Sequence, residues 1–489
     1  MIMKRYYSRL SARIHQLEGW SLTSCFSRSI LVHIAFPAVI LLLFLGSSAF
    51  AQINPWINNN VYDPEKWDTA GPETATPWLH PPTWTPDQGW GVFSGKWRTT
   101  GALTGSWGGL RDRLAKHGVQ WITAYFGQFA ADPAGGERQG VSWKGDLSTG
   151  LYLDLERLVN WKRGYVVASF TFINPGSSLS PDFIGNQFPV QLDTGDKDGS
   201  ARLVHLAFGQ QLFDNYAGLV LGRIITGEDF ATLRLACTSL NQGICGNPIA
   251  ATQSISFPTY PSAVWGARFK VKPGTSWYGQ AGSYVVYEDF RDPDDHGIDF
   301  SFPSGSGLLT IAEFGYIVGK FTGTPGLPGR YKVGGYYDGE RLTELRTDQN
   351  DRGTWGLYIM GEQMLYSENS GYTEGLSVWG ALSYAPEDRN IITFMAAGGL
   401  SYQGAIPGRS DDILAFNFAY GHYSGDLRQF ERNNEETVQH GETVLELNYR
   451  IQVAPWLYFV PDVQVVINPD GRHDISDALV LGFGAGTVL

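Results

Sequence analysis

The stretch TVLELNYRIQVAP, residues 443–455, decides the fold class, because its residues alternate between apolar and polar. Successive side chains of a β-strand point to opposite faces, so the stretch predicts a strand with one apolar and one polar face. The apolar set is Leu445, Leu447, Tyr449, Ile451 and Val453, and the polar set is Glu446, Asn448, Arg450 and Gln452. Such a strand is typical of a soluble sandwich with its apolar face on a protein core. It is equally typical of a membrane barrel with its apolar face on lipid.

The composition favours many strands and turns. The chain has 489 residues, of which 60 are Gly, 14% are aromatic and 17% are charged. Soluble domains usually contain about 25% charged residues. A chain of this length commonly forms two or three soluble domains, but one large barrel also accommodates it.

Residues 1–51 have the features of a secretory signal peptide. Basic residues precede the apolar run ILVHIAFPAVILLLFL (30–45), and Ala49-Phe50-Ala51 follows as a cleavage site. The alternative, a spanning helix, is disfavoured by the short run and by Pro37. We predict export with cleavage after Ala51. Removing five basic residues and one acidic residue changes the formal net charge from −12 to −16, and such an acidic exported chain is not expected to bind nucleic acid.

Two segments precede the strands. Residues 52–104 are rich in Pro and Trp and show neither strand nor helix periodicity, so we expect an extended N-terminal arm. In GSWGGLRDRLAKHG (105–118) two leucines lie four residues apart, which predicts a short helix near 107–117. Ser106 is the expected cap and Gly118 the expected end of this helix.

From about Val119 to Leu489 the pattern has a period of two residues, and no second long apolar run occurs. A chain of this kind crosses a bilayer only as a closed barrel. We therefore predict an all-β fold, a closed antiparallel transmembrane β-barrel over residues 105–489. At roughly 45 residues per strand pair it has about 16 strands. A soluble β-sandwich is the alternative.

The connections between the expected strands alternate in length, as in barrels with tight periplasmic turns and large outer loops. Short turns are expected at 384–391 and 452–458, and long connections at 174–200, 231–260, 289–308, 338–353 and 423–441. Two strand segments, 165–174 and 391–400, are apolar on both faces. We expect their inner faces to meet the arm or an infolded loop.

Two cysteines remain after the predicted cleavage, Cys237 and Cys245, eight residues apart in a turn-rich stretch. An oxidising compartment favours a disulfide that closes a small loop. The alternative is two free thiols. A metal site is not expected, because no His lies near them.

No enzyme motif is present, neither HExxH nor GxxxxGK[ST] nor GxSxG. An outer-membrane acyl hydrolase would need a Ser–His dyad, and Ser424 lies too close in sequence to His422 to support one. We therefore expect no enzyme activity, no catalytic residue and no cofactor.

Polar and aromatic residues share strand faces at two places. Their members are Tyr152 with Asp154 and Glu156, and Tyr458 with Asp462 and Gln464. Sugars bind in this way, because their C–H faces stack on aromatic rings while their hydroxyls bond to carboxylates, amides and guanidinium groups. The alternative is that the aromatic residues form interface girdles and the charges keep a pore hydrated.

Several motifs, in order, resemble the carbohydrate-selective porins of the OprB family. They are GSWGGLRDRLAKHGV (105–119), LVLGRIITGEDF (219–230), FPTYPSAVWGARFKVKPGTSWYGQAG (257–282), LPGRYKVGGYYD (327–338), GLYIMGEQMLY (356–366) and the segment from Glu442 to Gly471. The resemblance implies a sixteen-stranded barrel in the outer membrane of a Gram-negative bacterium, in contact with its lipid. It also implies a homotrimer that passes mono- and oligosaccharides by diffusion, without a cofactor.

The resemblance and the strand parity together suggest which side chains line the pore. Motif matching gives Arg223, Asp229, Arg268, Glu362, Glu446, Arg450 and Asp462, and parity adds Asp154, Glu156, Asn448, Tyr458 and Gln464. The chain departs from the family in ending with Leu489 rather than an aromatic residue, and in its long arm. The arm leaves open an alternative function, in which the barrel is an exit or anchor of a polysaccharide-secretion system.

Overall fold

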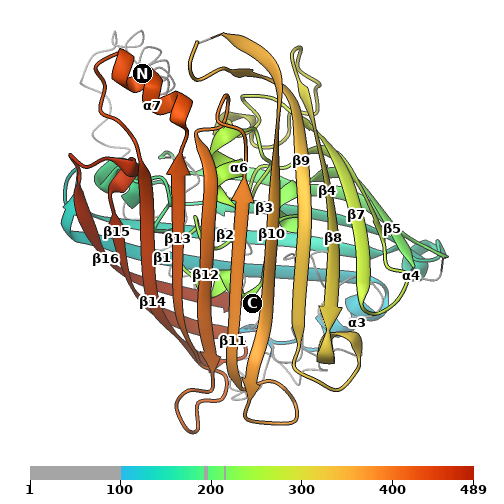
Figure 1. Cartoon of the computed structure of the whole chain (residues 1–489). Helices are drawn as coiled ribbons and strands as arrows, with labels where there is room; N and C mark the ends of the chain where they lie inside the picture. The colour runs from blue at the N-terminus through green and yellow to red at the C-terminus, as the bar shows by residue number, and fades with distance from the viewer. Residues whose placement is uncertain (1–100, 192–196, 214–215, 348) are drawn as a thin grey trace, which may run out of the picture. The chain divides into compact units, whose positions relative to one another are not determined.

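The computed structural model describes residues 101–489, apart from 192–196, 214–215 and 348. The predicted signal peptide and residues 52–100 of the predicted arm lie outside the described residues. Within the described range, sixteen strands form one closed barrel (Figure 1). Each strand is antiparallel to both neighbours, and β1 closes the ring by pairing with β16. The predicted fold class is confirmed.

The strands are as follows. They are β1 (Val119–Gly136), β2 (Gly140–Asp154), β3 (Gly164–Ile173), β4 (Ser200–Leu212), β5 (Ala217–Ile224), β6 (Val264–Val271), β7 (Trp277–Val286), β8 (Gly307–Val318), β9 (Gly329–Thr343), β10 (Asn350–Ser367), β11 (Gly375–Tyr384), β12 (Ile392–Gln403), β13 (Ile413–Tyr423), β14 (Gly441–Ala454), β15 (Leu457–Ile467) and β16 (Ser476–Val488).

One short helix precedes β1, and others occupy some of the connections between the strands. They are α3 (Leu110–Lys116), α4 (Leu155–Val159), η5 (Ser180–Ile184), α5 (Thr226–Asp229), η7 (Leu235–Thr238), α6 (Ile249–Ser254), η8 (Pro293–Asp295), η9 (Gly319–Thr322), α7 (Gly425–Asn433) and η10 (Pro469–Gly471). Among the described residues, no α-helix combines the length and the hydropathy that a bilayer crossing requires.

The predicted helix near 107–117 corresponds to α3, but its cap differs from the prediction. Gly109 with φ 87° is the residue before the helix, and Ser106 instead lies one turn earlier, where its hydroxyl accepts a hydrogen bond from Gly109 N. Gly118 with φ 90° follows the helix, as expected for a residue that ends a helix in the left-handed region.

Strand β14 shows which face meets which surroundings. Leu447 is 52% exposed on the outside of the barrel, whereas the adjacent Glu446 is 1% exposed on the inside. Exposed apolar side chains recur on the other strands, among them Phe269, Val333, Ile359, Leu414 and Val463. A closed barrel leaves no unpaired strand edge, so this apolar exterior suits lipid contact.

The alternation of connection lengths differs from the prediction at two places. The long connections lie at one end of the barrel, here called the outer end. This end also carries two short connections, 385–391 and the one between Thr343 and Asn350. Segment 338–353 is therefore not a long loop. Its residues extend β9 and β10, which remain paired up to Thr343 and Asn350, so an extended hairpin replaces a loop. The turn between β14 and β15 lies at the opposite, short-turn end.

Replacing Leu447 by Arg tests the outward face. A cation on the lipid face near the bilayer midplane costs about 2–4 kcal/mol. We expect Leu447→Arg to lower the free energy of unfolding by this amount, measured by denaturant-induced unfolding in lipid vesicles, while Leu447→Val changes it far less. Equal stability of the arginine variant and the wild type would show that this face meets water.

Candidate functional site

Two connections enter the described part of the barrel, residues 174–199 between β3 and β4 and residues 225–263 between β5 and β6. Residues 225–263, here called the inward loop, join β5 to β6 and contain α5, η7 and α6. Most of the loop is buried, with Phe230 and Phe257 at 0% exposure. The loop packs against the inner side of β12, which accounts for the apolar inner face of that strand.

Carboxylates on three widely spaced strands hold the inward loop. Each accepts a hydrogen bond from a loop backbone N–H, an arrangement that is stronger than a bond between neutral groups. The bonds are Ala231 N to Glu313 Oε2 of β8 (3.0 Å), Leu235 N to Glu362 Oε2 of β10 (3.0 Å) and Leu240 N to Glu446 Oε1 of β14 (2.7 Å). These contacts fix residues 231–240 of the loop to the barrel wall.

Three predicted pore residues on β14 and β15, Glu446, Asn448 and Gln464, serve the same purpose. Glu446 also accepts hydrogen bonds from the Ser239 hydroxyl and, at 2.7 Å, from Asn448 Nδ2. Asn448 Nδ2 donates to Thr238 O at 2.9 Å, and Gln464 Oε1 accepts from Asn241 Nδ2 at 2.9 Å. Glu446 and Gln464 thus bond to the loop instead of facing open water.

The first turn of the inward loop is held by ion pairs. Asp229 lies 3.0 Å from Arg268 of β6, and Glu228 lies 2.7 Å from His205 of β4. Burial raises the pKa of both acidic groups, and the facing cation or imidazole opposes that rise. His205 also contacts the Ser169 hydroxyl at 2.8 Å. Ser169 is only 1% exposed, so this Ser–His–Glu chain has no access for a substrate and is structural.

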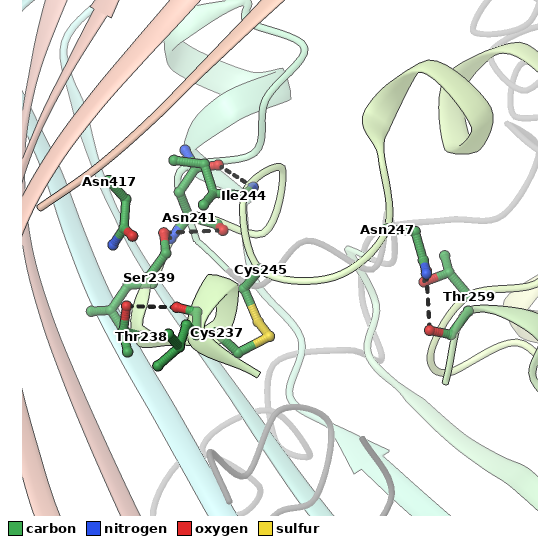
Figure 2. The surroundings of a disulfide bond; sticks show 12 residues. Cys237, Thr238, Ser239, Asn241, Ile244, Cys245, Asn247, Thr259 and Asn417 are labelled. Carbon is green, nitrogen blue, oxygen red and sulfur yellow. Dashed lines mark hydrogen bonds between the residues drawn. A yellow bond between two sulfur atoms is a disulfide. The ribbon is translucent and has the colours of Figure 1, made fainter. Parts of the chain in front are cut away.

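A disulfide closes the middle of the inward loop. Cys237 and Cys245 are bonded across eight residues, so the free-thiol alternative does not describe the structure. Inside this turn, Asn241 accepts hydrogen bonds from the backbone of Ile244 and from the Ser239 hydroxyl, as Figure 2 shows. The disulfide therefore restrains the segment that carries Thr238, Ser239 and Leu240.

A narrow space, here called the Arg450 pocket, lies between this segment and the wall. It is lined by Phe126, the loop residues 237–240, Ile413, Asn448, Arg450, Tyr458 and Val460. Tyr458 packs with Phe126, Leu240 and Val460, which makes one side of the pocket aromatic and apolar.

Arg450 is the polar centre of this pocket. Its guanidinium lies over the Tyr458 ring at 4.2 Å, and its Nη2 donates to Gln452 Oε1 at 2.9 Å. Within the described part of the chain, Arg450 Nε and Nη1 have no hydrogen-bond partner, although the residue is only 3% exposed. An aromatic ring next to unused N–H donors suits a sugar, which presents C–H groups and hydroxyls together.

A second narrow space adjoins the first. Both are lined by Thr238 and Ile413, and the second continues to Tyr372, Thr373 and Gln403 near the short-turn end. The two spaces thus lie in succession on the side of the inward loop that faces the short turns.

Three predicted pore residues do not face the lumen. Asp154 and Glu156 lie in the turn after β2, where Asp154 caps α4 and Glu156 accepts a hydrogen bond from Arg163 N. The strand parity that suggested them ends at Asp154, where the chain turns into α4.

Arg223 is on the outside of the barrel. It pairs with Trp265 and shares the outward face of β5 with Leu221, which is 42% exposed. The connection between β7 and β8 folds over it, so that Arg223 Nη1 donates to Asp299 O at 2.7 Å. Motif matching suggested this arginine but assigns no face, whereas its parity with Leu221 places it outside.

The sequence reasoning missed Glu313. It is 3% exposed and accepts hydrogen bonds from the Tyr278 and Tyr358 hydroxyls, each at 2.8 Å, in addition to that from Ala231 N. Its position among apolar residues in TIAEFGY could have identified it as a pore residue, because a carboxylate in an alternating strand of a membrane barrel faces inward.

The remaining candidates for chemistry have structural roles. Ser424 caps α7, and His422 Nδ1 lies 3.1 Å from the Tyr420 hydroxyl. Over the described ranges, no three His, Cys, Asp or Glu side chains gather as metal ligands would.

Comparison with known proteins agrees with this architecture. The chain is 26% identical to Porin B of Pseudomonas aeruginosa over 79% of this chain and 91% of that protein. It is 25% identical to the putative porin QuiX of Acinetobacter baylyi over 78% of this chain and 91% of that protein. Its fold matches a high-pH structure of Pseudomonas putida OprB with a TM-score of 0.75 and 22% identity, over 80% of this chain and 99% of that one.

The sequence profile of the carbohydrate-selective porins, OprB family, matches residues 138–489. Together with the closed sixteen-stranded barrel and its apolar exterior, this match shows that the chain belongs to the OprB family of carbohydrate-selective porins and resides in the outer membrane of a Gram-negative bacterium.

Proposed function

We propose that the protein is a passive channel through which mono- and oligosaccharides diffuse, that it assembles as a homotrimer, and that the Arg450 pocket is a contact point on the sugar path. The observation that carries this proposal is the stack of Arg450 on Tyr458 beside Asn448. It offers an apolar ring, cationic donors and an amide within one pocket. Family membership supports the substrate class.

The mechanism needs no cofactor and no covalent step. A sugar that enters the pocket exchanges hydrogen bonds with water for bonds with Arg450 and Asn448, while its C–H face contacts Tyr458 and Phe126. Contacts of this kind favour entry, and they are individually weak enough for the sugar to leave toward the next space. The second space, which shares Thr238 with the first, is the next contact point on this path.

The inward loop sets the width of the path in this proposal. Its segment 237–240 forms one side of the pocket, and Glu446 holds that segment through Leu240 N and the Ser239 hydroxyl. Because the site is buried, water does not replace Glu446 as the acceptor for these two donors. The position of this one side chain therefore determines how closely the loop approaches Arg450.

Tyr458 provides the first test. Replacing the ring by Leu removes a stacking contribution of about 0.5–1.5 kcal/mol, which weakens sugar binding about three- to tenfold. We expect the block of ion current by glucose, titrated in planar bilayers, to weaken by that factor in Tyr458→Leu. Tyr458→Phe keeps the ring and should behave like the wild type. If glucose blocks the wild type without saturation, or blocks the Leu variant equally well, the pocket is not on the sugar path.

Glu446 provides the second test. In Glu446→Gln the side-chain amide replaces one accepting oxygen, and one loop donor loses its partner at a cost of about 1–3 kcal/mol. We expect larger single-channel conductance and more current noise, because segment 237–240 is released from the wall. Glu435→Gln, at an exposed site beyond α7, is the matched control. Identical conductance of Glu446→Gln and the wild type would contradict the role of Glu446.

A further inference from the structure

Arg450 differs from other inward-facing cations in its partners. Arg268, Arg330 and Lys332 lie 3.0, 3.5 and 3.6 Å from Asp229, Glu362 and Glu313, respectively, so each is paired with a carboxylate. Among the described residues, Arg450 has no such pair, and its side-chain hydrogen bond goes to the neutral amide of Gln452. Burying an unpaired cation is costly, which points to a partner that arrives from solution.

The charges of Asp411 and Asp412 act on Arg450, but neither acid forms an ion pair with it in the described structure. Asp412 accepts two hydrogen bonds from Arg409, both at 2.8 Å, and one from the Tyr449 hydroxyl at 2.7 Å. Glu446 is four residues away along β14, about 13 Å in a strand, and is bonded to the inward loop. Asp462 lies within hydrogen-bonding reach of Glu446. None of these acids forms an ion pair with Arg450 in the described structure.

The unused donors of Arg450 belong to the Arg450 pocket. Arg450 Nε and Nη1 are buried without partners among the described residues, and the residue lines that pocket. Asn448 Oδ1 also lacks a partner among the described residues and lines the same space. The pocket thus combines cationic donors, one free acceptor and the aromatic surface of Tyr458 and Phe126.

We infer that the Arg450 pocket prefers sugars that carry a carboxylate, namely uronic or aldonic acids, over neutral sugars of the same size. The carboxylate receives charge-assisted hydrogen bonds from Arg450, a hydroxyl donates to Asn448 Oδ1, and the sugar ring contacts the aromatic side. The inference rests on the proposed function and narrows its substrate class. Since the chain carries a formal net charge of −12, the attraction for an anion has to be supplied locally, by this cation.

The test compares glucose with glucuronate at constant ionic strength and pH 7. Each sugar is titrated against the ion current of the wild-type channel in a planar bilayer, with acetate as a carboxylate that lacks the ring. Hydrogen bonds to a charged group contribute more than neutral ones, so we expect glucuronate to block with about tenfold higher affinity than glucose. Acetate should block more weakly than glucuronate.

Substitutions then assign the preference to Arg450. Arg450→Gln should remove the preference for glucuronate and change the affinity for glucose far less, while Arg450→Lys should keep part of it. Arg432→Gln, on the exposed surface of α7, removes a cation outside the pocket and is the matched control.

The outcomes separate the two proposals. Equal affinity for glucose and glucuronate in the wild type, or a preference that persists in Arg450→Gln, overturns the inference and leaves the sugar channel standing. A conducting channel that neither sugar blocks overturns the proposed function as well. If Arg450→Gln does not insert into the membrane, comparing the two sugars in the wild type and in Arg450→Lys still tests the inference.

Discussion

The hydrocarbon core of a membrane offers no hydrogen-bond partner to the peptide backbone, and the rest of this structure follows from that constraint. Every strand must pair on both edges, which the ring from β1 to β16 achieves. Closure of the ring then assigns alternate side chains to lipid and to the interior. The opposite exposures of Leu447 and Glu446 are a direct consequence.

The interior of the barrel is not simply a water-filled space lined by charges. A loop of nearly forty residues, 225–263, enters it and brings its own backbone donors into a buried region. Buried N–H groups need acceptors, and the wall supplies carboxylates at Glu313, Glu362 and Glu446. Charged residues inside the barrel therefore divide into two kinds, those that hold the loop and those that remain available.

Arg450 belongs to the second kind. Its guanidinium stacks on the Tyr458 ring, and one of its nitrogens donates a hydrogen bond to Gln452. Its other donors, Nε and Nη1, have no partner among the described residues. The disulfide between Cys237 and Cys245 restrains the opposite side. A rigid loop facing an oriented cation is an arrangement in which selectivity arises from position, without any moving part.

The sequence alone determined the strands, the closed barrel and the inward orientation of Glu446, Asn448 and Arg450, because a period of two residues depends only on local strand geometry. It did not determine which inward residues meet the loop. Glu446 and Arg450 lie four residues apart on the same face, yet one bonds to Leu240 and the other does not. Parity also failed where the chain leaves the strand, at Asp154, which caps α4. Only the tertiary structure decided these roles, because the path of a loop through a barrel depends on partners more than two hundred residues away.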